Sequence, residues 1–272
     1  MPCGNPRRGL IRNELLSTRG DRNLNLKGSV ALVTGGTKGI GAATALKLAE
    51  LGADVAILGR HDTDGARGVC AAVEAAGRRS LMIVADMAKP GDAVRAVQET
   101  VASMGGLDVL VHSAGGGLVG GFTEVAEADW YRMFDVHVHA AFHLCREAVP
   151  HMKRRGGGAI VFVSSVAGLR GVPNIVPYGV AKGALIQFTR GLAREFADFN
   201  IRVNGVAPGI IKTDFHSAMT PEQERHNLDN RIPLHRFGTP EQVAEVIALL
   251  AANDFITGET YTIDGGMTMR MM

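Results

Sequence analysis

The stretch Thr34-Gly35-Gly36-Thr37-Lys38-Gly39-Ile40-Gly41 follows a short apolar run at residues 30–33 and leads into a segment with apolar residues at helical spacing. Glycines at this point allow a tight turn and let main-chain N–H groups approach a phosphate. The first turn of the following helix adds a partial positive charge. This context predicts a nucleotide-binding loop in which Gly35, Thr37, Lys38, Gly39, Ile40 and Gly41 contact the nucleotide. No Gly-Lys-Ser/Thr follows at P-loop spacing, while a methyltransferase form of the sheet remains open at this point.

Short, mostly apolar runs alternate with longer helical patterns along the rest of the chain. The predicted strands are 30–33, 55–58, 81–85, 109–112, 160–163, 202–207 and 260–263, and the predicted helices are 41–51, 64–76, 91–103, 178–199 and 240–251. Continuously apolar strands are typical of a sheet that is covered on both faces. The alternation therefore predicts an α/β fold: a single doubly wound Rossmann domain with a seven-stranded parallel sheet flanked by helices.

Composition and charge narrow the classes of protein. The chain has 272 residues, 46% of them hydrophobic, and a formal net charge of +2. These values argue against disorder and give no reason to expect nucleic acid or a membrane as a partner. No apolar run approaches the ~18 residues that cross a bilayer. The cysteines at positions 3, 70 and 145 are too far apart for a disulfide framework, so we expect reduced thiols and a cytoplasmic location.

The first 26 residues differ from the rest of the chain. They carry arginines at positions 7, 8, 12, 19 and 22 and lack the apolar core of a signal peptide. The acidic Glu14 and Asp21 speak against a transit peptide. We expect a flexible N-terminal extension over residues 1–26 and one dinucleotide-binding and catalytic domain over residues 27–272.

The end of the second strand bears on the choice of nucleotide. A free ribose 2′-hydroxyl favours an acidic partner about 20 residues beyond the glycines, whereas a 2′-phosphate favours arginine. Here the strand ends in Gly59-Arg60-His61, and Lys38 stands inside the glycine loop. Two cations without an acid at the tip favour NADP over NAD. In the alternative interpretation Arg60 is a solvated turn residue, and Asp62 or Asp64 reaches back to the ribose.

A possible reaction centre lies in Tyr178-Gly179-Val180-Ala181-Lys182. Residues four apart share one face of a helix, so the phenol and the ammonium can share a site. A nearby cation favours the phenolate and lowers its pKa, which makes tyrosine a usable acid and base. Ser165, at the end of the preceding apolar run, can donate a hydrogen bond to a substrate oxygen beside Tyr178. No Gly-x-Ser-x-Gly surrounds it, so hydrolase chemistry is disfavoured.

With these motifs the chain resembles the short-chain dehydrogenase/reductase family from about Leu26 to Gly266. The resemblance rests on the glycine loop, on Asp86 and on Ser165, Tyr178 and Lys182. It also covers Asn204-Gly205-Val206-Ala207-Pro208-Gly209, Ile256-Thr257-Gly258 and Asp264-Gly265-Gly266. The segment 231–238 is similar to that of 3-oxoacyl-carrier-protein reductases and sugar dehydrogenases. This similarity does not indicate which substrate the protein takes.

The resemblance implies an NADP(H)-dependent oxidoreductase that moves a hydride between the nicotinamide and a carbonyl or secondary alcohol. Tyr178 would be the proton donor and acceptor and Ser165 would orient the carbonyl. Lys182 would lower the pKa of the tyrosine and hold the nicotinamide ribose. Asp86 would contact the adenine, and Ile211 and Thr213 would contact the carboxamide. Further expected cofactor contacts are Arg60, Met87, Ser113, Ala114, Gly115, Tyr178, Lys182, Pro208 and Gly209. The resemblance also implies a homotetramer.

Two histidines depart from the family pattern. His112-Ser113-Ala114-Gly115 replaces Asn-Asn-Ala-Gly, and Asp135-Val136-His137 replaces Asp-Val-Asn. His137 therefore stands at the fourth catalytic position, where the family residue supports a water that leads from the lysine towards solvent. If the main-chain carbonyl holds that water, His137 suffices. If the side chain matters, proton relay slows or acquires the pH dependence of a histidine.

Two further interpretations follow from the histidines. A nucleotide-binding sensor or scaffold of the same fold, with weak catalysis, is the alternative function. His139 and His143 have the i, i+4 spacing of helical zinc ligands, but Ala140 stands where such sites need glutamate, so we expect no metal site. The substrate pocket is expected along residues 116–122 and 169–175 and in the segment that follows Pro208-Gly209.

Overall fold

The computed structural model describes residues 26–217 and 219–269. Within them, seven strands form one parallel sheet in the order β3-β2-β1-β4-β5-β6-β7. The strands are β1 (Val30–Thr34), β2 (Asp54–Gly59), β3 (Ser80–Val84), β4 (Val109–His112), β5 (Gly158–Val163), β6 (Ile201–Pro208) and β7 (Thr260–Ile263). The predicted strands and the doubly wound fold are confirmed, with strand ends shifted by at most two residues.

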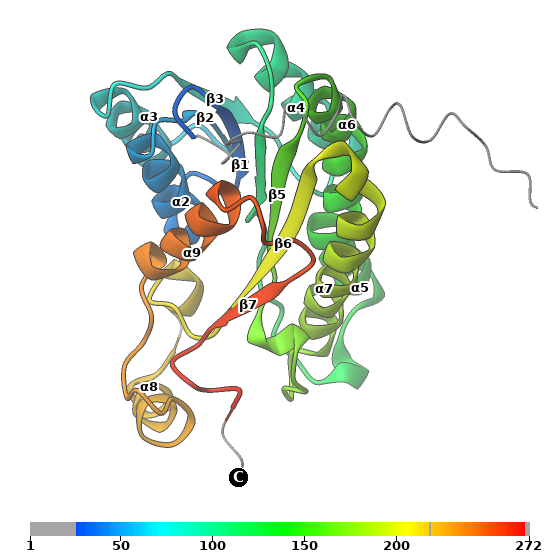
Figure 1. Cartoon of the computed structure of the whole chain (residues 1–272). Helices are drawn as coiled ribbons and strands as arrows, with labels where there is room; N and C mark the ends of the chain where they lie inside the picture. Colours follow the sequence, from blue (N-terminus) through cyan, green and yellow to red (C-terminus); the bar gives the residue numbers. More distant parts are fainter. Residues whose placement is uncertain (1–25, 218, 270–272) are drawn as a thin grey trace, which may run out of the picture.

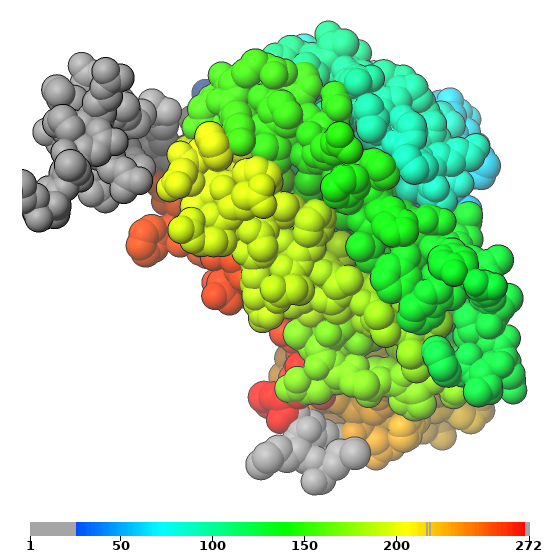
Figure 2. Space-filling model, turned by 90° about the vertical axis from the view of Figure 1, so that its right-hand side faces the viewer, coloured from blue at the N-terminus to red at the C-terminus, as the bar shows by residue number. Residues whose placement is uncertain are grey.

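Helices cover both faces of the sheet (Figure 1). One layer contains α2 (Gly39–Glu50), α3 (Asp64–Ala75) and α9 (Pro240–Ala252). The opposite layer contains α4 (Pro90–Met104), α5 (Glu127–Phe134), α6 (Ala140–Arg154) and α7 (Val176–Phe196). Figure 2, seen from the side of this second layer, shows α6 and α7 covering the sheet.

Each face of the sheet has its own hydrophobic core, because alternate side chains of a strand point to opposite faces. Leu32 and Ile160 pack towards α4, α6 and α7, whereas Val33 and Val161 pack towards α2 and α9. Both sets are fully buried, which explains why the central strands read as continuous apolar runs.

Three helices were not among the predicted helical segments: α5, α6 and the short α8 (Pro221–His226). Helix α5 is joined to α6 by a π-helical turn, η2 (Asp135–His139), and α6 contains Pro150. A π turn shifts the angular position of the residues that follow, so a regular 3.6-residue pattern does not run through this region.

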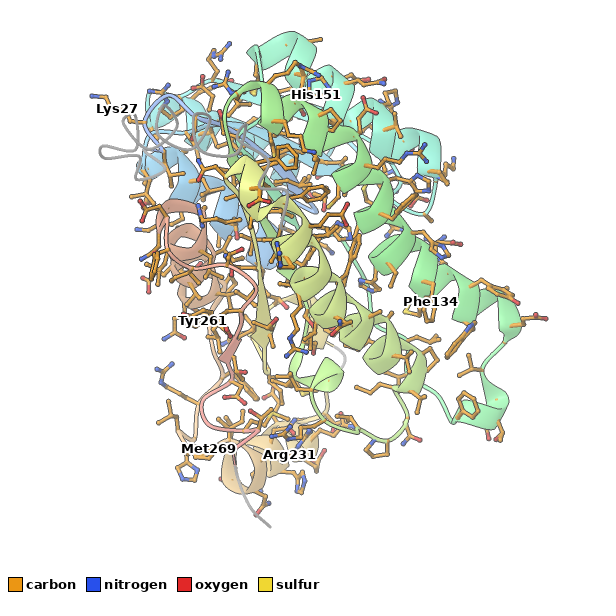
Figure 3. All side chains as sticks on the ribbon, turned by 45° about the vertical axis from the view of Figure 1, so that its right-hand side comes forward. Lys27, Phe134, His151, Arg231, Tyr261 and Met269 are labelled. Atoms are coloured by element: carbon orange, nitrogen blue, oxygen red, sulfur yellow. The ribbon has the colours of Figure 1, made fainter. Side chains whose placement is uncertain are left out.

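The parallel arrangement brings the carboxyl ends of all strands to one end of the domain. The chain runs outward from β1 to β3 and then returns to β4 on the other side of β1, so strand order reverses at the ends of β1 and β4. Arg231 and Met269 lie at this end of the molecule, whereas Lys27 and His151 lie at the opposite end (Figure 3). A ligand is expected in the crevice beyond β1 and β4.

Leu26, the first described residue, packs into the core of the domain. Leu26 is buried in the core beside α2 and α9, and its carbonyl oxygen accepts a hydrogen bond of 2.8 Å from the Ser29 hydroxyl. The domain therefore includes Leu26, because its side chain contributes to the core. The expectation of a flexible extension falls on residues 1–25, which lie outside the described residues. Among the described helices, none is both long and apolar enough to cross a membrane.

A buried arginine ties β6 to the end of α9. Arg202 is 6% exposed and donates to the carbonyl oxygens of Leu250 and Ala251 at 2.5 and 2.6 Å. Its burial lowers the pKa of the guanidinium to about 10. These carbonyls lie at the C-terminus of α9, where a cation complements the helix dipole.

Replacing Arg202 by Met should lower the free energy of unfolding by about 2–3 kcal/mol, because two buried carbonyls lose their charged donor. Denaturant unfolding followed by circular dichroism measures the change. Arg190→Met, at an exposed position of α7, is the control and should stay within about 0.5 kcal/mol of the native protein. A loss from Arg202→Met as small as that of the control contradicts this account of β6 and α9.

Candidate active site

A cavity of about 1420 Å³ opens at the carboxyl end of the sheet, and all the predicted site residues line it. The residues from the first half of the chain are Gly35, Thr37, Lys38, Gly39, Ile40, Gly41, Arg60, Asp86, Met87, Ser113, Ala114, Gly115 and His137. Those from the second half are Ser165, Tyr178, Lys182, Pro208, Gly209, Ile211 and Thr213. The fold thus brings together segments that are up to about 180 residues apart, as expected of parallel strands that end at one edge.

The glycine loop has the close backbone packing that its sequence predicts. A Cβ atom at Gly35 would lie 2.8 Å from the Ala114 Cα atom, and one at Gly41 would overlap the Gly35 carbonyl. Gly35 and Gly39 have positive φ angles, 67° and 55°. Side chains at these positions would distort the turn, so the glycines keep the backbone open towards the cavity.

The N-terminus of α2 fits an anion. Lys38 occupies the N-cap position without a side-chain hydrogen bond to the helix, and the first turn of α2 carries no acidic residue. The main-chain N–H groups at the start of α2 therefore face the cavity end of the domain. No acidic side chain of the first turn is available to accept hydrogen bonds from them. Combined with the glycine cradle, this arrangement fits the phosphates of a dinucleotide. The residues present thus suit the nicotinamide cofactors of the family that the sequence resembles.

Lys38 and Arg60, the two cations expected near the nucleotide, both line the cavity, but they differ in their surroundings. Lys38 Nζ lies 3.7 Å from Asp214 Oδ2, and both side chains are exposed. Arg60 is exposed at the end of β2. Asp62 and Asp64, the alternative ribose partners, pair with Arg67 at 2.8 and 2.5 Å. Neither aspartate lines the cavity.

The reaction centre forms where α7 meets the end of β5. Tyr178 and Lys182 lie one turn apart near the start of α7, and Ser165 follows β5 and caps a short 3₁₀ turn by accepting from the Ala167 N–H at 3.2 Å. Lys182 Nζ donates to the Val163 carbonyl at 2.7 Å and lies 5.6 Å from the centre of the Tyr178 ring. The Ser165 side chain lies close enough to Tyr178 to lower the pKa of the phenol. The three side chains predicted from the sequence therefore form one cluster.

The acid–base properties of this cluster differ from the expectation in one respect. Burial raises the pKa of Tyr178, and the Ser165 side chain offsets part of this rise. The lowering of the tyrosine pKa by Lys182 is thus absent from this structure. Burial also lowers the pKa of Lys182 to about 7, so the amine carries only part of a positive charge near neutrality. Helical spacing predicts that Tyr178 and Lys182 are neighbours, but it does not predict the burial of the phenol and the amine.

His137 is buried beside Tyr178. The two rings meet edge to face with centres 5.7 Å apart. His137 Nε2 lies 3.0 Å from the Gly116 carbonyl oxygen, so this nitrogen carries the hydrogen. Among the described side chains, His137 Nδ1 is a buried nitrogen without a hydrogen-bond partner. Burial and then the positive charge of Lys182 hold the pKa of His137 well below its ordinary value.

The outer part of the cavity agrees in part with the predicted substrate pocket. Gly116, Gly117, Val119 and residues 172–175 line it, as does the segment that follows Gly209. Phe215 in that segment is 51% exposed, and its ring lies 6.0 Å from the Tyr178 ring. A Cβ atom at Gly117 would come 2.8 Å from the Phe215 ring, so the glycine makes room for the phenyl group.

The sequence analysis missed the contribution of α5 and η2 to the cavity, where Arg132, Met133 and Val136 also form part of the wall. The i, i+1 and i+4 spacing of these residues could have indicated one helical face. The rings of Trp130 and Phe134 pack against each other at a tilt, with centres 5.1 Å apart, and neither residue lines the cavity.

The histidines of the zinc pattern have other neighbours. His139 Nδ1 lies 2.9 Å from Asp135 Oδ1, and the His143 ring packs against Phe142 at 5.0 Å. Within residues 26–217 and 219–269, no group of three or more His, Cys, Asp and Glu side chains is arranged to hold a metal ion.

A parallel sheet with a glycine loop, and a Ser–Tyr–Lys cluster in the same cavity, define the class of Rossmann-fold oxidoreductases. A family model described as Enoyl-(Acyl carrier protein) reductase matches residues 35–268. An uncharacterized oxidoreductase of Thermotoga maritima is 38% identical over 252 residues, which cover 90% of this chain and 99% of that protein. The chain belongs to the short-chain dehydrogenase/reductase family.

Two further relatives agree with this assignment. Dehydrogenase/reductase SDR family member 4 of Oryctolagus cuniculus is 37% identical over 250 residues, which cover 90% of this chain and 96% of that protein. The crystal structure of a putative short-chain alcohol dehydrogenase from Sinorhizobium meliloti superposes with a TM-score of 0.86 at 34% identity. The superposition covers 92% of this chain and 100% of the Sinorhizobium meliloti chain.

The burial of His112 should make the free energy of unfolding depend on pH. Burial, followed by the charge of Lys182, lowers the pKa of His112 to about 4, from an ordinary value of 6.5. Below pH 6.5, His112 binds a proton in the unfolded chain but stays neutral in the folded protein. The free energy of unfolding should therefore fall as the pH drops from 6.5 to 4. His112 alone should account for roughly 3 kcal/mol of this fall.

Urea unfolding at several pH values between 7.5 and 4 measures this slope. His112→Asn, which cannot titrate, should make the slope shallower, whereas the control His61→Asn at an exposed position should leave it unchanged. An equally steep slope in His112→Asn would show that this buried imidazole is not the source.

Proposed function

We propose that the protein is an NADP(H)-dependent carbonyl reductase or alcohol dehydrogenase. The observation that carries this proposal is the convergence of Ser165, Tyr178 and Lys182 with the glycine loop on one cavity. When bound, the nicotinamide would supply or accept the hydride. The part of this chain is to hold the cofactor, to orient the carbonyl and to move a proton at its oxygen.

The proton chemistry falls to Tyr178. Its hydroxyl would donate a proton to the substrate oxygen in reduction and take it back in alcohol oxidation. Ser165, which lies beside Tyr178, would donate to the same substrate oxygen and stabilise its developing negative charge, an effect worth about 3 kcal/mol in comparable sites. Because the pKa of Tyr178 is raised in this structure, the hydroxyl keeps its proton near neutrality, which suits the reductive direction.

Lys182 would resupply that proton. Its pKa of about 7 lets the amine give up and regain a proton near neutral pH, and its hydrogen bond to Val163 fixes the position of Nζ. We propose that the fourth catalytic position works through the main-chain carbonyl of His137. The lowered pKa of the His137 ring argues against proton uptake by the imidazole near neutrality.

Two features support NADP as the cofactor. Arg60 stands at the end of β2 beside the cavity, and the aspartates that could bind a free ribose hydroxyl are paired with Arg67. A 2′-phosphate would favour the guanidinium, because charge-assisted hydrogen bonds to arginine are strong and directional. The homotetramer and the cytoplasmic location expected from the sequence remain predictions.

The alternative function is a nucleotide sensor or scaffold with weak catalysis. Its support is that histidines replace asparagine at positions 112 and 137. Against it stands the assembled cluster of Ser165, Tyr178 and Lys182 within one cavity. Assays of a panel of ketones and alcohols with both cofactors separate the two proposals, because a sensor binds the nucleotide and turns over no member of the panel.

Replacing Tyr178 by Phe should lower kcat by about 10²–10⁴-fold, since the proton donor is lost while the ring remains. The dissociation constant of NADPH, measured by its fluorescence, should change by less than about fivefold. Tyr261→Phe on β7, outside the cavity, is the matched control. Full activity of Tyr178→Phe would remove the basis of this mechanism.

Replacing Arg60 by Asp should reduce the preference for NADPH over NADH by about 10–100-fold in kcat/KM, because one charge-assisted contact with a phosphate is worth about 1.5–3 kcal/mol. Arg190→Asp provides the same charge change at an exposed position of α7. Steady-state kinetics with both cofactors measure the ratio. Equal use of NADH and NADPH by the native protein contradicts the cofactor proposal.

A further inference from the structure

His112 and His137 lie in two segments that meet beside the reaction centre. His112 is the last residue of β4, and His137 lies in the π-helical turn η2. Each is 1% exposed. The mechanism uses the position of His137 but gives no role to His112, so the burial of a second imidazole here needs a physical account.

The hydrogen bonds of His112 determine its tautomer. Its Nε2 atom lies 3.2 Å from the main-chain carbonyl oxygen of His137, which can only accept, so Nε2 carries the hydrogen. In the neutral ring Nδ1 is then an acceptor, and the Thr34 hydroxyl donates to it at 2.8 Å. The same hydroxyl accepts from the Ala114 N–H at 3.1 Å. Both ring nitrogens of His112 and the Thr34 hydroxyl thus have hydrogen-bond partners.

The side chain of His137 makes the reciprocal contact. Its Nε2–H donates to the Gly116 carbonyl at 3.0 Å. Each imidazole therefore donates to a main-chain carbonyl of the segment that carries the other. Two segments, residues 112–116 and 135–139, are held together by this pair of hydrogen bonds, which we call the histidine clasp.

The clasp also fixes the surroundings of Tyr178. A Cβ atom at Gly115 would overlap Cε1 of His137, so the ring rests directly against the backbone of the loop. On its other side the ring meets the Tyr178 ring edge to face at 5.7 Å. A displacement of either clasped segment would therefore move the imidazole that supports the tyrosine.

We propose that His112 and His137 act as one positioning unit, in which each imidazole is needed for the other to hold the loop 112–116 and the turn 135–139 against Tyr178. The kinetic part of this inference rests on the proposed function. Both bonds restrain the same relative movement of the two segments. Loss of one bond releases that movement, and loss of the second then costs little more.

The test is a double-mutant cycle with His112→Leu, His137→Leu and the double variant, because leucine removes the N–H donor of each imidazole. Each single substitution should lower kcat, measured at saturating NADPH, at least 10-fold. NADPH binding should weaken to a similar degree in both single variants, because Ser113, Ala114 and Gly115 of the clasped loop line the cavity. The double variant should stay within about threefold of the weaker single variant. If the losses multiply instead, the two histidines act independently and the proposal is wrong.

A conservative variant separates positioning from general damage to the fold. The amide N–H of Gln can reach the His137 carbonyl, so His112→Gln can keep this donor and should retain kcat within about fivefold. Equal losses in His112→Gln and His112→Leu contradict the role of this bond. Should a Leu variant fail to fold, the ring NMR of the native protein still tests both hydrogen bonds. As a control, His143→Leu on α6 combined with His137→Leu should give effects that multiply.

Nitrogen-15 NMR of the histidine rings tests the clasp without any activity assay. At pH 7.5 the native protein should show both imidazoles neutral, with hydrogen on Nε2 and none on Nδ1, and His112→Asn should shift the Nε2 signal of His137. A proton on Nδ1 of either ring overturns the proposal. Because this result does not depend on turnover, it distinguishes failure of the clasp from failure of the proposed reaction.

Discussion

The site depends on how closely α7 lies against the end of β5. Lys182 Nζ donates to the Val163 carbonyl, and the Ser164 hydroxyl donates to the Lys182 carbonyl at 2.7 Å. A Cβ atom at Gly168 would come 2.7 Å from the backbone of Lys182, so a larger residue would push the helix away. This contact places Tyr178, Lys182 and Ser165 in one cluster.

Close packing also controls the charges in the site. Burial lowers the pKa of Lys182 to about 7 and the pKa of His112 to about 4, and it raises the pKa of Tyr178. Removing water penalises every charged form, and the positive charge of Lys182 further opposes a proton on either histidine. As a result, Lys182 is the group of this cluster that exchanges a proton close to neutral pH, while the imidazoles serve as neutral hydrogen-bonding groups.

Much of the fold and of the site was predictable because the signals are local. The apolar runs predicted the seven strands, and the glycine loop predicted both the first turn and its cavity. The loop works through backbone geometry, which a few neighbouring residues determine. In contrast, the π turn at Asp135–His139 and the cavity wall formed by α5 were missed, because their positions depend on packing against distant helices.

The sequence by itself determined the doubly wound sheet and the family, and it predicted the serine, tyrosine and lysine that the structure brings into one cavity, since each belongs to a short motif with regular spacing. Only the tertiary structure decided the protonation behaviour of those groups. It also decided that the histidines at 112 and 137 bond to each other's segments and that the Phe215 ring packs beside the Tyr178 ring. The reason is physical: burial and contact between residues far apart in the chain set pKa values and hydrogen-bond partners, and neither is encoded by local spacing.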